Sequence, residues 1–201
     1  AVGAKISVVA LGASTGGPLA LQEILARLPK DLPVPLLIVQ HISTGFADGF
    51  AEWLAKSSGY PVRVATAGEP ALAGSAYVAP SGVQMRLLAN GCIDLVDAPP
   101  EHGLKPSVSY LFRSLAATFG PAAIGVLLTG MGRDGAQELK ALREAGAVTV
   151  AQDSETAIVF GMPGEAVKLG AAAYVLAPDA IAALLERLLR AAVQTDEEKQ
   201  A

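Results

Sequence analysis

Apolar runs alternate with amphipathic stretches along most of this chain, a pattern that predicts buried strands connected by helices. The first apolar run starts at Ile6 and is rich in β-branched residues; past a glycine-rich turn, apolar residues recur at helical spacing as far as Leu28. Later apolar runs predict further strands over Pro33–Gln40, Ala122–Leu128, Val148–Ala151 and Ala173–Leu176. Four of the predicted helices are Phe46–Ser57, Ser107–Phe119 with Ser107 as N-cap, Pro163–Leu169 and Asp179–Val193.

The middle of the chain has a different pattern. From Tyr60 to Val96 the segments are short, alternate between apolar and polar residues, and are broken by glycine and proline. The dipeptide Asn90-Gly91 between two such segments is typical of a two-residue hairpin. We therefore expect antiparallel strands here, attached to an otherwise parallel sheet.

The order of the elements predicts the fold class. Strands and helices alternate, a β-rich insert follows, and the alternation resumes after Pro106 with a helix that runs from the turn Thr129–Gly135 to Ala145. This order predicts a doubly wound α/β domain with a mainly parallel sheet, helices on both faces and an antiparallel β-hairpin. We expect one domain over residues 1–193 and a polar, disordered tail over residues 194–201.

Composition narrows the class of protein. The chain has 201 residues, 52% of them hydrophobic, which is enough for one sizeable core. No apolar run approaches the ~18 residues needed to span a bilayer, and the N-terminus lacks a signal-peptide pattern, so we expect a soluble cytoplasmic protein without membrane insertion. A net charge of −4 without Lys/Arg clusters argues against nucleic acid as a partner. The single cysteine, Cys92, excludes an internal disulfide.

Ser14 lies on the first strand-to-helix turn, where two interpretations compete. Its hydroxyl would face the unpaired N–H groups of the new helix, which favour developing negative charge. In the first interpretation, Ser14 is a nucleophile. In the second, the turn binds a phosphate group and Ser14 only caps the helix. The second alternative describes a phosphate- or nucleotide-binding signalling module, although the turn lacks the lysine of a Walker loop and the G-x-G-x-x-G spacing.

Two more polar residues, His41 and Asp134, follow the carboxyl ends of predicted strands. In an open parallel sheet these ends meet at one edge, where ligands bind. A serine hydroxyl needs a base to become nucleophilic, and the imidazole needs a carboxylate to fix its tautomer. The three residues therefore predict a Ser14–His41–Asp134 triad. The alternatives are a core or capping role for His41 and a helix cap for Asp134.

The remaining ionisable residues offer little competing chemistry. His102, the second histidine, lies in a loop with proline and glycine nearby, where we expect it to be solvated; it is the alternative candidate for the base. Two histidines and one cysteine give no metal-ligand pattern, so we expect no metal site.

Five segments together resemble the catalytic domain of the chemotaxis protein-glutamate methylesterases, the CheB family. They are Gly12–Pro18, Val39–His41, Lys105–Val108, Leu128–Ala136 and Val159–Pro163. The resemblance runs in order over nearly the whole chain. It implies a serine hydrolase that removes methyl esters from glutamate side chains on the cytoplasmic helical bundle of methyl-accepting chemotaxis receptors and releases methanol. It also implies deamidation of receptor glutamines, and it implies no cofactor.

The resemblance assigns roles to individual residues. Ser14 matches the nucleophile, His41 the base and Asp134 the orienting acid, while Thr15 and Met131 match positions that contact the oxyanion and the substrate. Two departures stand out. Only a few residues precede the first strand, where the family usually carries a phosphorylatable receiver domain, so we expect an excised domain or a protein without that domain. The family's usual Pro-Ser-Val-Asp is here Pro-Ser-Val-Ser, with Ser109 in the last position.

Overall fold

The computed structural model describes residues 5–200, and side chains are described as far as residue 191. Its centre is a seven-stranded sheet in the order β3-β4-β2-β1-β7-β8-β9. Every pair of neighbouring strands in this sheet is parallel. The strands are β1 (Val8–Ala13), β2 (Leu36–Gln40), β3 (Val62–Val64), β4 (Ala76–Val78), β7 (Ala123–Leu127), β8 (Val148–Gln152) and β9 (Tyr174–Leu176).

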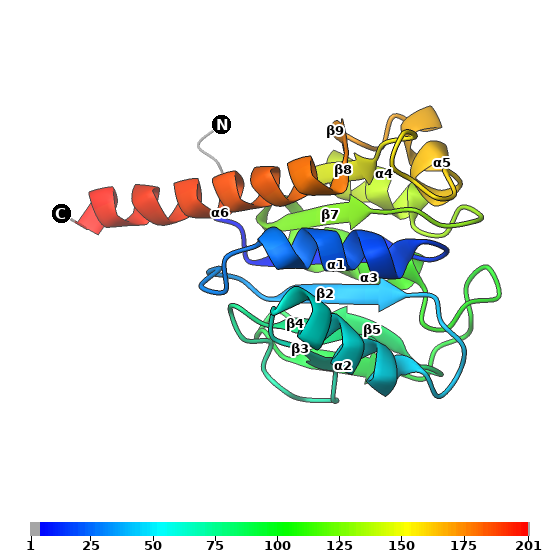
Figure 1. Cartoon of the computed structure of the whole chain (residues 1–201). Helices are drawn as coiled ribbons and strands as arrows, with labels where there is room; N and C mark the ends of the chain where they lie inside the picture. Colours follow the sequence, from blue (N-terminus) through cyan, green and yellow to red (C-terminus); the bar gives the residue numbers. More distant parts are fainter. Residues whose placement is uncertain (1–4, 201) are drawn as a thin grey trace.

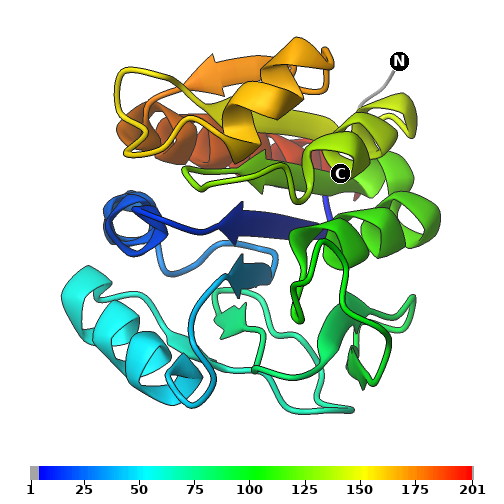
Figure 2. The same cartoon turned by 90° about the vertical axis from the view of Figure 1, so that its right-hand side faces the viewer.

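Helices cover both faces of the sheet, which explains why the central strands are apolar on both sides. Helices α1 (Gly17–Arg27), α2 (Ala47–Ser58) and α6 (Pro178–Gln200) pack on one face, against residues such as Val9 and Leu11 of β1. Helices α3 (Val108–Thr118), α4 (Ala136–Glu144) and α5 (Met162–Lys168) pack on the other, against Val8 and Ala10. Figure 2 shows the blue α1 and cyan α2 on one side of the sheet and the green α3 on the other. The predicted doubly wound α/β fold is confirmed.

The predicted hairpin is also confirmed. Strands β5 (Gln84–Leu87) and β6 (Ile93–Val96) pair antiparallel around the Asn90-Gly91 turn, where Gly91 has a φ of +82°. They form a separate two-stranded sheet that packs under α3 and adds Met85 and Ile93 to the core of that face.

One expectation for the middle of the chain is wrong. The other strands of this segment, β3 and β4, are parallel members of the main sheet, and the hairpin is not attached to it. Each of the two strands has only three residues, and alternation of apolar and polar residues carries no information on strand direction. The loop over residues 65–75 returns the chain to the start of β4 without a helix, so the usual signal of a parallel crossover is missing.

The last helix runs further than the sequence predicts. It is α6 (Pro178–Gln200), whereas the pattern predicts an end at Val193. The side chains of residues 192–201 lie outside the described part of the chain, so the domain boundary at residue 193 and the disorder of the tail stay predictions. Within residues 5–200, no helix combines the length and the apolar character that a bilayer crossing requires.

The parallel arrangement determines where a site can form. Strand β1 lies between β2 and β7. The chain first builds β2, β3 and β4 on one side of β1 and later builds β7, β8 and β9 on the other. Figure 1 shows β2 and β7 pointing to the same side of the molecule. Such a switch point, beyond the carboxyl ends of the strands, is where ligands bind in open α/β sheets.

Candidate active site

Ser14, His41 and Asp134 all lie in segments that follow the carboxyl ends of the three central strands. Ser14 comes directly after β1 and His41 directly after β2, and the last register pair of these strands is Ala13 with Gln40. The main-chain N–H of His41 donates to the Ala13 carbonyl at 3.0 Å, which brings the two strand ends together. Asp134 lies in the turn between β7 and α4. The structure therefore places these three residues at one edge of the sheet.

His41 and Asp134 are in direct contact. His41 Nε2 lies 2.7 Å from Asp134 Oδ2, and the side chains are 10% and 1% exposed. An ionised carboxylate can only accept, so Nε2 carries the hydrogen and Nδ1 keeps its lone pair in the neutral ring. The imidazole is thus held in one tautomer with Nδ1 available as a base.

The carboxylate of Asp134 also receives two main-chain N–H groups from the first turn of α3. Val108 N donates to Oδ2 at 2.7 Å and Ser109 N donates to Oδ1 at 2.9 Å. Burial of the carboxyl raises its pKa, but the hydrogen bonds from His41, Ser109 and Val108 outweigh this effect and hold the pKa of Asp134 below its ordinary value. Asp134 is therefore an ionised carboxylate at neutral pH.

Two glycines allow α3 to approach this closely. A Cβ at Gly12 would lie 2.4 Å from Val108 Cγ1, and a Cβ at Gly135 would lie 2.5 Å from the same atom. Any side chain at either position would push the start of α3 away from Asp134. The predicted N-cap at Ser107 is confirmed, since its side chain accepts from Tyr110 N.

Ser109 is also part of this arrangement. Its hydroxyl donates to Glu138 Oε2 at 2.8 Å and accepts from Gly135 N at 2.9 Å. Glu138 also pairs with Arg113 at 3.5 Å. The loop that carries Asp134 is thus connected to α3 and α4 without a carboxylate at position 109.

Ser14 is held by its main chain. Its N–H donates to the Thr129 carbonyl at 2.9 Å, and its carbonyl accepts from Gly17 N at 2.8 Å. A Cβ at Gly130 would lie 2.7 Å from Ser14 Cβ, so the β7 loop packs closely against the serine. Ser14 is part-exposed, and its hydroxyl has no hydrogen bond to any described residue. Contacts between a catalytic serine and its base often form only when substrate binds.

Thr15 follows Ser14 in the same turn, and Met131 lies in the loop after β7. Among the residues that the structure describes, the main-chain N–H groups of Thr15 and Met131 have no acceptor. Met131 is 72% exposed. Thr129 Oγ1 lies 2.9 Å from the Thr15 carbonyl and accepts from Val159 N at 3.0 Å, so it connects three loops of the site. Two unpaired N–H groups beside a serine can stabilise an oxyanion.

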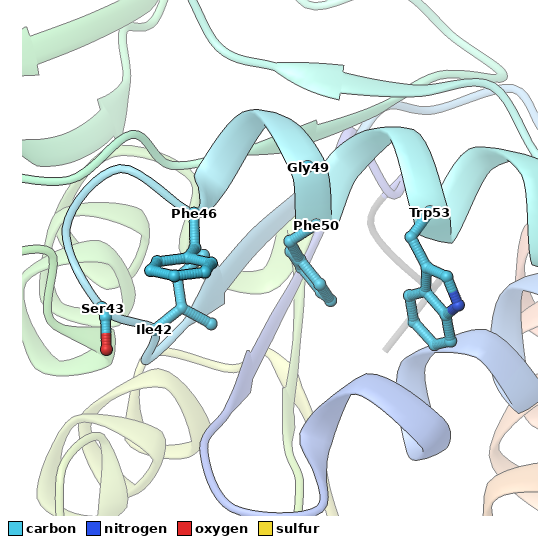
Figure 3. Close-up of a pocket in the computed structure, with 6 residues that line it drawn as sticks. All are labelled: Ile42, Ser43, Phe46, Gly49, Phe50 and Trp53. Atoms are coloured by element: carbon cyan, nitrogen blue, oxygen red, sulfur yellow. The ribbon is translucent and has the colours of Figure 1, made fainter.

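An apolar hollow of about 460 Å³ lies along α2 and begins at Ile42, the residue after His41. It is lined by Ile42, Ser43, Phe46, Gly49, Phe50 and Trp53. Figure 3 shows the rings of Phe46, Phe50 and Trp53 on one side of the helix. Within this hollow, Phe46 is 66% exposed and Trp53 is 40% exposed. Exposed apolar groups gathered in this way mark a surface that binds another molecule.

His102 is not part of this arrangement. It is exposed, as expected, and lies in a second, polar hollow with Arg133 and Glu138. No hydrogen bond of the described residues joins it to Ser14 or Asp134. Among the side chains that the structure describes, as far as residue 191, no three from His, Cys, Asp or Glu are grouped as a metal site would require.

Sequence reasoning assigned no role to the residues that hold the site together. Thr129, Ser109 and Glu138 act through hydrogen bonds between segments that lie far apart in the chain. The only signal for Thr129 is a polar residue directly after the apolar run Ala122–Leu128. Nothing in the local pattern connects Ser109 with Glu138.

Comparison with known proteins gives a consistent result. The family model described as CheB methylesterase matches residues 9–185. Protein-glutamate methylesterase/protein-glutamine glutaminase 4 of Geobacter metallireducens is 56% identical over 188 residues, which are 93% of this chain and 54% of that protein. The corresponding protein 1 of Syntrophus aciditrophicus is 53% identical, over 92% of this chain and 53% of its own length. This chain thus spans about half the length of the curated relatives it matches.

A solved structure agrees with these relatives. The crystal structure of the Thermotoga maritima CheB methylesterase catalytic domain superposes with a TM-score of 0.88 at 34% sequence identity. The match covers 92% of this chain and 100% of the solved one.

Proposed function

Because the chain belongs to the CheB methylesterase family, we propose that it hydrolyses γ-methyl esters of glutamate side chains in methyl-accepting chemotaxis receptors, with release of methanol. Deamidation of receptor glutamines is the second proposed activity, in line with the names of its relatives. The observation that carries the proposal is the contact between His41 and the buried carboxylate of Asp134, at the strand ends beside Ser14.

The first step is attack by Ser14 Oγ on the ester carbonyl. His41 Nδ1 takes the serine proton, because Nε2 is engaged by Asp134. Negative charge develops on the carbonyl oxygen, where the N–H groups of Thr15 and Met131 stabilise it. Asp134 stays ionised and supports the imidazolium that forms.

The tetrahedral intermediate then loses its leaving group. The bond to the methoxy oxygen breaks, His41 Nδ1 returns the proton to that oxygen, and methanol leaves an acyl group on Ser14. Water attacks this acyl group and gives its proton to Nδ1; the serine oxygen recovers the proton as the glutamate carboxylate is released. Deamidation follows the same steps with ammonia as the leaving group.

The substrate is proposed to be a helix of the receptor's cytoplasmic bundle. A helix presents apolar side chains beside the modified glutamate, and the hollow along α2 offers an apolar surface next to His41. One enzyme must visit many receptor sites, so binding is expected to be brief and to depend on local concentration. A receiver domain, in the same protein or as a partner, is proposed to control access to the site. Because the proposed substrate is the cytoplasmic bundle of the receptor, the proposed reaction takes place in the cytoplasm.

Peptide mass spectrometry tests the proposal. A receptor fragment that carries glutamyl methyl esters and glutamines is incubated with the protein and with the Ser14→Ala variant. We expect esters, and glutamines at particular sites, to become acids with the parent protein only. The phosphate-binding alternative predicts stabilisation by phosphate or nucleotide and no change in the receptor peptides. Unchanged peptides would overturn the proposed function.

A further inference from the structure

Gln40 is a buried polar residue at the end of an apolar strand. It is the last residue of β2, directly before His41, and is 3% exposed. Its amide Nε2 donates to the Ser14 carbonyl at 2.9 Å and to the His41 carbonyl at 3.1 Å. One side chain therefore connects the turn of the proposed nucleophile with the turn of the proposed base.

The hydrogen bond to Ser14 determines the direction of the next N–H group. Lys105–Pro106 is the cis peptide of the described residues, so the peptide between Ser14 and Thr15 is trans. In a trans peptide the carbonyl and the following N–H point in opposite directions. Because Gln40 Nε2 and Gly17 N hold the Ser14 carbonyl inside the turn, the Thr15 N–H points outward. This N–H group has no acceptor within residues 5–200.

The packing around the amide is tight and leaves one atom unsatisfied. A Cβ at Gly17 would lie 2.1 Å from Gln40 Oε1, so glycine at this position gives the amide its space. Gln40 Oε1 is buried and has no hydrogen-bond partner. A buried polar atom without a partner lowers stability, and an apolar side chain of the same length would avoid this cost. Stability alone does not explain the presence of Gln40.

We propose that Gln40 is a positioning residue for ester hydrolysis, an inference that depends on the proposed function. Gln40 fixes the Ser14–Thr15 peptide so that the Thr15 N–H faces the oxyanion, and it holds this peptide against the turn that carries His41. Gln40 contributes to the rate of hydrolysis in the transition state, since the oxyanion forms only there.

Gln40→Met removes both hydrogen bonds with little change in volume. Thr149→Val is the matched control, because Thr149 Oγ1 also donates from a buried side chain to a main-chain carbonyl, that of Ala171, and lies near the start of β8, at the other edge of the sheet. We expect Gln40→Met to lower kcat per folded molecule about 10- to 100-fold with KM within about twofold. Thr149→Val should keep the kcat of the parent protein.

A second measurement uses the parent protein itself. Reaction of Ser14 with a phosphonate places a phosphoryl oxygen where the oxyanion would form. The amide resonance of Thr15 should then move downfield in the NMR spectrum, and this shift should be lost or reduced in Gln40→Met. An unmoved Thr15 resonance, or a Gln40→Met variant with the kcat of an active parent protein, would overturn this inference alone. A parent protein that neither turns over receptor esters nor reacts with the phosphonate would overturn the proposed function and the inference with it.

Discussion

His41 Nε2 lies 2.7 Å from Asp134 Oδ2, although the two residues are 93 positions apart in the chain. The contact depends on three parallel strands that end at one edge of the sheet and on the start of α3, which donates two N–H groups to the same carboxylate. The imidazole therefore turns Nε2 to the acid, and Nδ1 is the nitrogen that we propose as the base for Ser14. This is the reverse of the ring orientation in chymotrypsin-type triads.

Replacement of Ser14 and His41 tests whether they act as a unit. We expect Ser14→Ala and His41→Ala each to lower turnover by roughly 10⁴- to 10⁶-fold. The double variant should lose little more, because neither residue contributes to catalysis when the other is absent. Steady-state rates of the three variants provide the check. Losses that multiply in the double variant would show that the two residues act independently.

Asp134→Asn tests the acid through both activity and stability. An asparagine cannot support the imidazolium or enforce the tautomer, so kcat should fall by about 10⁴-fold. The lowered pKa of Asp134 also has a consequence for the fold. The ionised carboxylate stabilises the protein above the ordinary pKa of 3.8, and this contribution is lost as the pH falls through the lowered value.

Urea unfolding between pH 2 and pH 7 measures this contribution. The pH range brackets the ordinary pKa of a carboxyl group, which is about 4. The free energy of unfolding of the parent protein should decline more steeply toward acid pH than that of Asp134→Asn. Equal slopes would contradict the lowered pKa. Activity of Asp134→Asn near the parent level would contradict the role of the acid.

The Ser109–Glu138 hydrogen bond predicts how this chain tolerates substitutions at position 109. Ser109→Ala should lower the free energy of unfolding by about 1 kcal/mol, because Gly135 N loses its buried acceptor. Ser114→Ala is the control, since the Ser114 hydroxyl only donates to Leu111 O within the same helix. Its expected change is much smaller.

Ser109→Asp should destabilise the protein further, because it places a second carboxylate beside Glu138. Glu138→Gln should then recover much of the loss in the double variant. Chemical denaturation of the four proteins checks this coupling. A Ser109→Asp variant as stable as the parent protein would contradict the expected repulsion between the carboxylates at positions 109 and 138.

The hollow along α2 predicts a substrate effect separate from the chemistry. Phe46→Ala removes an exposed ring, so we expect no large loss of stability, an increase in KM for the receptor of about 3- to 30-fold, and an unchanged kcat. Hydrolysis of a small methyl ester should be unaffected, since such a substrate does not reach the hollow.

Leu72→Ala is the matched control for Phe46→Ala, because Leu72 is 53% exposed in the loop before β4, toward the opposite edge of the sheet. It should leave both KM values unchanged. Equal effects of the two substitutions on the receptor KM would exclude a specific role for the hollow.

Much of the fold follows from the sequence because burial imposes a pattern. Fully apolar runs such as Ala122–Leu128 identify central strands, and Asn90-Gly91 identifies the hairpin. The direction of β3 and β4 does not follow, because three-residue strands carry no directional signal. Their parallel pairing depends on the neighbouring strand β2, to which β4 is hydrogen-bonded.

For the candidate site, the sequence predicts which residues follow the strand ends, but not the contacts that hold them in place. Parallel topology brings Ser14, His41 and Asp134 to one edge, so their meeting could be inferred from the positions of the apolar runs. The supporting bonds of Gln40 and Ser109 join segments that are remote in sequence, and the ring nitrogen that faces Asp134 depends on side-chain geometry. Neither these hydrogen bonds nor the orientation of the imidazole ring can be derived from residue spacing.

Methanol release tests the central claim most directly. Receptors that carry radiolabelled methyl esters are incubated with the parent protein and, at the same concentration, with Ser14→Ala. The account predicts volatile labelled methanol in amounts that grow with time for the parent protein and a rate at least about 10⁴-fold lower for Ser14→Ala. Release at similar rates by both proteins, or by neither, would contradict it.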